Sequence, residues 1–188
     1  MWGTYRSSTF SLLLLWSISC HHAVGQTKVK APRFEDYPAT VQLVGPPKEP
    51  VLIERDHPLY KTRLRRGVLH GDGLVGNNTV ASPPVPNFAG AFYAVTWGCG
   101  SDGCAALAIV DGRTGTVYGP PPDASAVNTE FVATPRTHEC TGIGLRANSR
   151  LLFIDYADYS SGAIACQRTY YEWANGSYRF VQKVSVKP

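Results

Sequence analysis

CQRTYYEWANGSYRFVQKV, residues 166–184, contains the strongest hairpin signal of the chain. Two runs rich in aromatic and β-branched residues flank Ala174-Asn175-Gly176-Ser177. Asn-Gly favours a two-residue turn because both of its central residues readily take positive φ angles. Two antiparallel strands are therefore predicted, over 166–173 and 178–184. Alternation along the first strand places Tyr171 and Trp173 on one face, which we expect to meet the core.

Short runs of similar composition recur through the second half of the chain, separated by turns of Gly, Pro, Asn and Asp. They predict further strands over 92–98, 105–110, 116–118, 129–133, 143–146 and 151–156. Because 111–115 reads as a tight turn, the first three of these strands form a predicted meander. The predicted fold class is mainly β: an antiparallel meander sheet, a sandwich or a small barrel, with one N-terminal helix.

The helix is predicted to begin at Pro58. Asp56-His57-Pro58 places a capping side chain ahead of a proline in the first turn, and no glycine or proline follows before Gly67. Gly67 weakens the end of this helix, and Gly71 or Gly73 stops it. Its buried face is predicted to comprise Leu59, Leu64 and Val68.

Four basic side chains lie elsewhere on this helix: Lys61, Arg63, Arg65 and Arg66. Amphipathic helices commonly expose such charges to water, so we interpret the cluster as a solvated face. Binding of a polyanion there is the alternative hypothesis. The whole chain has 18 basic and 14 acidic residues, and this mild excess does not predict nucleic-acid binding.

The first 25 residues have the layout of a secretory signal peptide. One charge, Arg6, precedes an apolar run and the small residues Ala23-Val24-Gly25. We therefore predict export to the periplasm or the extracellular space, with a lipoprotein anchored at Cys20 as the alternative. No transmembrane span is expected in the mature chain, because the apolar run is far shorter than the roughly 20 residues that a membrane-spanning helix needs.

The remaining chain divides into an arm and one domain. Residues 26–55 are rich in proline and short polar residues, which predicts an extended arm over the domain surface. Residues 56–188 are predicted to form a single disulfide-stapled, β-rich domain.

Four cysteines remain in the predicted mature chain: Cys99, Cys104, Cys140 and Cys166. An even set of cysteines in an exported protein predicts disulfides, for which three connectivities exist. The pairing local in sequence is Cys99 with Cys104, across the turn at 100–103, and Cys140 with Cys166. A zinc site would need four clustered thiolates, and a redox pair would favour Cys-x-x-Cys, so no metal is expected.

Residues able to support catalysis are sparse. His138 and Glu139 adjoin Cys140, but a disulfide there would leave no thiolate to activate. Asp155 and Asp158 would form an acid pair only if both faced a groove, and we interpret them as solvated loop acids. No phosphate-binding glycine loop, dinucleotide motif or calcium loop is present, so no cofactor is expected.

Several short motifs together resemble an uncharacterised group of small exported bacterial proteins. They comprise Asn87-Phe88-Ala89-Gly90, Trp97-Gly98-Cys99-Gly100, Thr114-Gly115-Thr116-Val117-Tyr118, Ser149-Arg150-Leu151-Leu152 and Tyr170-Tyr171-Glu172-Trp173. The resemblance implies an exported location and a shared fold, but no reaction. The chain departs from the group's pattern at Ala91, where the group has a histidine. Gly90 and Gly115 are explained by turns or close backbone approach, and Asp111 by an Asx turn.

These observations predict an exported, non-enzymatic β-domain that binds a protein or a cell-envelope ligand, as an inhibitor or immunity-like module does. The alternative hypothesis is a small secreted hydrolase of cell-wall or glycan substrates that uses His138, Glu139, Asp155 or Asp158.

Overall fold

The computed structural model describes residues 30–52, 58–76, 84–98, 105–121, 142–158 and 165–186, without the side chains of residues 58, 59, 105, 156–158 and 165. All of its helices and strands belong to one unit, Ala31–Pro188. They comprise η1 (Phe34–Asp36), α1 (Pro58–His70), β1 (Phe92–Gly98), β2 (Ala105–Asp111), β3 (Val117–Tyr118), β4 (Ile143–Leu145), β5 (Leu151–Asp158), β6 (Ala165–Ala174) and β7 (Ser177–Val186).

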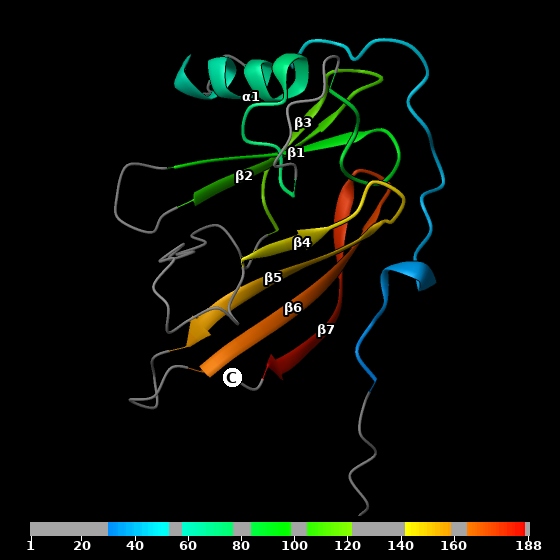
Figure 1. Ribbon diagram of the computed structural model, residues 1–188, viewed down its shortest axis with the longest axis vertical. Coiled ribbons are helices and arrows are strands. Elements are labelled where there is room, and N and C mark those ends of the chain that lie inside the picture. Colours follow the sequence, from blue (N-terminus) through cyan, green and yellow to red (C-terminus); the bar gives the residue numbers. More distant parts are fainter. Residues whose placement is uncertain are drawn as a thin grey trace, which may run out of the picture. The chain divides into compact units, whose positions relative to one another are not determined.

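The strands form two antiparallel sheets. β1, β2 and β3 make the first sheet as a meander, and β4, β5, β6 and β7 make the second in the same sequential order (Figure 1). Each strand therefore pairs with its neighbour in the chain, which needs only short turns. The prediction of a mainly β, antiparallel fold with one helix is confirmed, and the described strands close no barrel.

The two sheets pack face to face through an aromatic core. Phe92 of β1 meets Trp173 of β6 edge to face, with ring centroids 5.5 Å apart. Tyr118 of β3 also contacts Trp173, at 5.0 Å. Leu152 and Tyr171 of the second sheet join the same cluster. Tyr171 and Trp173 thus lie on the core face, as the alternation of the sequence predicted.

Helix α1 covers the other face of the first sheet. Leu64 and Val68 are buried against Tyr93 and Val95 of β1. Gly67 permits this close approach, since a Cβ there would lie 2.7 Å from both methyl groups of Val95. The helix ends at Gly71, whose φ is +82° and whose N–H donates to the carbonyl of Gly67 at 3.0 Å. This is an αL cap, so Gly71 ends the helix as predicted.

The turn between β6 and β7 has the geometry that Asn-Gly favours. Asn175 and Gly176 have φ angles of 52° and 73°, and Ala174 pairs with Ser177 across them. A bulge between Tyr170 and Tyr171 shifts the register farther along. The predicted strand over 92–98 coincides with β1, and the other predicted strands agree to within two residues at each end. The predicted strand over 129–133 lies outside the described residues.

Residues 30–52 run along both sheets without forming a strand. The N–H of Ala39 donates to the carbonyl of Asn148 in the second sheet's β4–β5 turn, and that of Leu43 donates to Gly90 beside the first sheet. Farther on, Val51 donates to Gly115. This segment is blue to cyan in Figure 1. No helix among the described residues is long and apolar enough to span a membrane.

Gly90 fixes the path of this segment. Its φ is +79°, and a Cβ there would clash with the carbonyl oxygen of Val41. Gly45 is the matched comparison, because its φ is +82° while a Cβ there would meet nothing within 4 Å. We expect Gly90→Ala to lower the free energy of unfolding by about 2–4 kcal/mol, and Gly45→Ala by about 1 kcal/mol from backbone strain alone.

Chemical denaturation of both variants measures this difference. Equal losses of unfolding free energy in the two variants would show that residues 38–43 do not pack against Gly90.

Candidate ligand pocket

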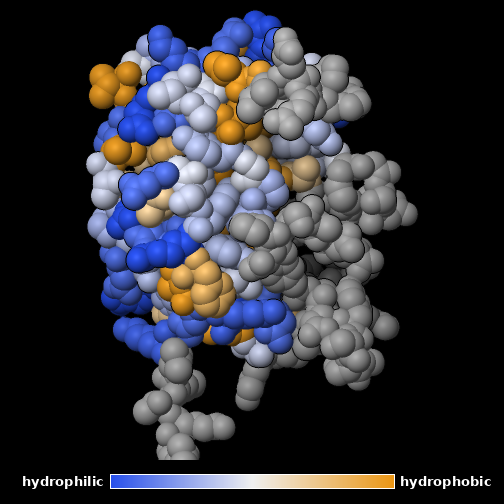
Figure 2. Space-filling model, turned by 180° about the vertical axis from the view of Figure 1, so that it is seen from behind, coloured by the Kyte–Doolittle hydropathy of each residue, from blue (hydrophilic) through white to orange (hydrophobic). Residues whose placement is uncertain are grey.

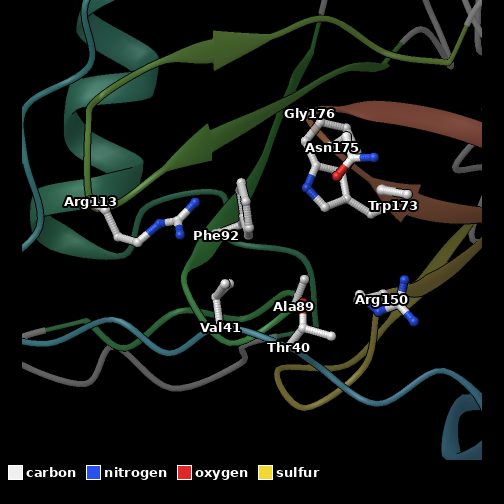
Figure 3. Close-up of a pocket in the computed structure, with 10 residues that line it drawn as sticks. Thr40, Val41, Ala89, Phe92, Arg113, Arg150, Trp173, Asn175 and Gly176 are labelled. Carbon is white, nitrogen blue, oxygen red and sulfur yellow. The ribbon is translucent and has the colours of Figure 1, made fainter.

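A pocket of about 430 Å³ opens where the two sheets and residues 40 and 41 meet. Its lining combines apolar side chains with a polar margin (Figure 3). Ala89, Phe92 and Trp173 are buried, whereas Thr40, Arg113 and Asn175 are exposed. Pockets of this size and composition are typical of sites for small ligands.

A strained turn supplies part of the lining. Ala89 has a φ of 46°, in the left-handed region that residues other than glycine rarely adopt. Its N–H donates to the carbonyl of Ser149 at 3.2 Å, and the N–H of Gly90 donates to Ala147. These bonds hold the turn before β1 against the β4–β5 turn of the second sheet. Strained backbone of this kind costs about 1–3 kcal/mol and persists where the surroundings enforce it.

Arg113 stands at one side of the pocket, held by Asp111. Its Nε and Nη2 donate to the two carboxylate oxygens, at 2.9 and 2.6 Å. The backbone N–H of Arg113 also donates to Asp111, which confirms the predicted Asx turn. The guanidinium lies 5.4 Å from the centroid of the Phe92 ring. The acid, the turn and the aromatic ring together fix where this arginine points.

The pKa of the Asp111 carboxyl reflects this environment. Burial is the strongest single influence and opposes ionisation, but the hydrogen bonds and the positive charge of Arg113 outweigh it and hold the pKa below its usual value. The same bond to Asp111 raises the pKa of Arg113. The pair is therefore fully ionised at neutral pH.

Arg150 lies on the opposite side of the pocket in Figure 3. Its Nε donates to the carbonyl of Pro38 at 3.0 Å, and Nη1 donates to the buried carboxylate of Glu172. Arg179 of β7 donates to the other oxygen of Glu172. Glu172 of β6 therefore links Arg150, just before β5, to Arg179 of β7, and Arg150 in turn contacts Pro38 of the arm.

One of the acids named in the hydrolase hypothesis is not solvated, contrary to the interpretation from the sequence. Asp155 lies within β5 and is buried rather than in a solvated loop, so that interpretation was wrong. Its oxygens accept from Nε and Nη2 of Arg168 at 2.7 and 2.8 Å, which raises the pKa of Arg168. Asp158 ends the same strand, but its side chain lies outside the described part. His138 and Glu139 lie outside it as well.

The basic cluster of α1 is exposed, as predicted. Arg65 pairs with Glu49 at 3.1 Å, and Arg66 pairs with Asp72 at 2.6 Å. Lys61 and Arg63 have no such partner among the described residues. Two of the four charges are thus compensated, so the helix face presents only a modest positive patch.

Cys166 is buried and disulfide-bonded. The other cysteines, Cys99, Cys104 and Cys140, lie outside the described residues, so the pairing of Cys140 with Cys166 stays a prediction. Within the described residues, no group of three or more His, Cys, Asp and Glu side chains could hold a metal ion.

Sequence patterns did not predict Arg113, Arg150 or Trp173 as site residues. The sequence indicated Arg113 only as part of a turn, Arg150 only as part of a motif, and Trp173 only as a core and motif residue. These three residues are brought together by the packing of one sheet on the other, which local sequence patterns do not predict.

Protein-family models, curated proteins and solved structures gave no match to this chain.

Asp111→Asn tests the ion pair at the pocket margin. Ionised Asp111 stabilises the fold above its unfolded-state pKa, near 3.9, and this stabilisation is lost as the pH falls through the lower folded-state pKa. We expect the variant to lose about 1–3 kcal/mol of unfolding free energy at pH 7, and to depend less on pH than the parent protein below about pH 4.

Glu49→Gln is the control, since its pair with Arg65 is exposed and should contribute little. Urea titrations between pH 2.5 and 7 measure both. Parallel pH profiles of the parent protein and Asp111→Asn would contradict a stabilising ion pair.

Proposed function

We propose that this protein is an exported, non-enzymatic domain that binds a cell-envelope ligand in the pocket between its two sheets. The observation that carries the proposal is the pocket itself, in which a buried aromatic lining meets arginines held in place by buried acids. Orienting such groups before the ligand arrives lowers the entropic cost of binding.

The state of the buried acids supports binding rather than acid–base catalysis. The buried carboxylates of the described residues belong to Asp111, Asp155 and Glu172, and each accepts hydrogen bonds from an arginine. The guanidinium groups therefore occupy carboxylate oxygens that an acid–base catalyst would need to keep open to its substrate. These acids therefore suit the positioning of arginines better than proton transfer.

The surface supports a pocket ligand rather than a broad apolar interface. The exposed large hydrophobic residues are scattered: Val44, Val51, Tyr60, Val85 and Phe180. On the face displayed in Figure 2, hydrophilic residues cover most of the described surface and hydrophobic ones gather in small separate groups. Extended protein interfaces commonly need a larger continuous patch.

Export is part of the proposal. It is supported by the N-terminal layout of a charge, an apolar run and small residues, and by the resemblance of the motifs to small exported bacterial proteins. An exported binding domain would meet its ligand in the envelope or outside the cell.

The two tryptophans of the exported chain provide a direct test. Trp2 and Trp16 lie in the predicted signal peptide, which leaves Trp97 and Trp173. Trp173 lines the pocket and Trp97 does not. We expect fractions of a native envelope extract to shift the indole N–H resonance of Trp173, measured by ¹⁵N–¹H NMR on the exported protein, and to leave that of Trp97 in place.

Thr40→Trp should fill the pocket and abolish the shift. Val44→Trp is the matched control, because Val44 belongs to the same segment, is 91% exposed and does not line the pocket. Extract fractions that shift no pocket resonance, or that act equally on both variants, would contradict the proposed function.

A further inference from the structure

The chemistry of the pocket lining identifies the class of ligand, an inference that rests on the function proposed above. Three lining residues carry only N–H donors in their side chains, namely Arg113, Arg150 and Trp173, whereas Thr40 and Asn175 can also accept hydrogen bonds. Arg113 commits Nε and Nη2 to Asp111, and its Nη1 has no hydrogen-bond partner among the described residues. A guanidinium nitrogen can donate but cannot accept a hydrogen bond.

The indole of Trp173 supplies a second donor. Figure 3 shows this side chain with its ring nitrogen turned toward Phe92, on whose other side Arg113 stands. The structure gives Nε1 no hydrogen-bond partner within the described part of the chain. Nε1 of Trp97, in contrast, is fully buried, and it has no hydrogen-bond partner among the described residues. One donor from the β2–β3 turn and one from β6 therefore stand on opposite sides of the Phe92 ring.

The rest of the floor is apolar. Val41 and Ala89 lie beside Phe92 in the same view, between Arg113 and Arg150. Arg150 commits its Nε and Nη1 to Pro38 and Glu172, so it closes the pocket as a positioned wall. A ligand that satisfies both sets of contacts needs an acceptor group at one end and an apolar body at the other.

The charge near Arg113 limits the acceptor to a singly charged group. The carboxylate of Asp111 lies behind the guanidinium, with Oδ2 2.6 Å from Nη2. It compensates the arginine and would repel a doubly charged phosphate more strongly than a carboxylate. A carboxylate also matches the remaining edge of a guanidinium in size and shape.

We propose that the pocket binds an organic carboxylate, which accepts from Nη1 of Arg113 and whose apolar body lies over Phe92, Val41 and Ala89. Two sources present this chemistry: a free organic acid, and the C-terminal carboxylate of a peptide that ends in an apolar residue.

Titration of the exported protein with small probes tests the proposal without any substitution. The probes are hexanoate, hexanamide, hexylamine and hexylphosphonate, and the readout is the indole resonance of Trp173. We expect hexanoate to bind at least tenfold more tightly than the other three, and its affinity to fall as salt is added. N-acetyl-leucine compared with its amide, and acetyl-Gly-Leu compared with acetyl-Gly-Leu-amide, then separate the two sources.

The double variant Asp111→Asn/Arg113→Gln removes the charged donor without leaving Asp111 buried and unpaired. We expect it to lose hexanoate affinity at least tenfold. Asp72→Asn/Arg66→Gln is the matched control, because it neutralises an exposed ion pair of α1 and also leaves the net charge unchanged. This control should bind hexanoate as the parent protein does.

Equal binding of hexanoate and hexanamide, or full affinity in the Asp111→Asn/Arg113→Gln variant, would overturn the carboxylate assignment. If envelope fractions still shifted the Trp173 resonance in that case, the pocket would bind a ligand of another class. If neither the probes nor the fractions shifted it, the proposed function would fail as well.

Discussion

The contact between Phe92 and Trp173 is the interaction on which the rest of the structure depends. It joins β1 of the first sheet to β6 of the second, and Phe88, Tyr118 and Tyr178 pack around the same indole. Each sheet is a simple meander that would be marginal alone, because a small sheet needs a covered hydrophobic face. The edge-to-face packing of these rings supplies that cover and sets the spacing between the sheets.

The same contact forms the pocket floor, so stability and binding share their central residues. Around it, the arginines are held by carboxylates that are themselves buried: Arg113 by Asp111, and Arg150 by Glu172. Buried ion pairs add little net stability compared with apolar packing, but they fix side-chain direction. The segment that passes Gly90 completes the wall with Thr40 and Val41, which lie about fifty residues before the nearest strand residue of the floor.

Local sequence patterns predicted most of the fold. The Asn175-Gly176 turn, the meander of the first sheet and the end of α1 at Gly71 each depend on neighbours in the chain, so the residues themselves specify them. The core face of Tyr171 and Trp173 followed from alternation. The opposite face of β6 was not predicted to be buried, yet Glu172 is only 5% exposed, because it is neutralised by Arg150, which precedes β5, and by Arg179 of β7.

The pocket could not be predicted in the same way. Arg113 and Trp173 are 60 positions apart, one in the turn between β2 and β3 of the first sheet and the other in β6 of the second, so only the packing of the sheets places both beside the Phe92 ring. Asp155 shows the same limit, since its burial and its pairing with Arg168 follow from the strand register. Single-sequence patterns give the order of the strands, whereas partners across a sheet or between sheets require the fold.

A crystal structure of the exported protein grown with hexanoate tests the central claim most directly. We predict Phe92 packed edge to face on Trp173, with the carboxylate within hydrogen-bond distance of Nη1 of Arg113. Sheets that meet through other residues, or a hexanoate bound away from Arg113, would contradict it.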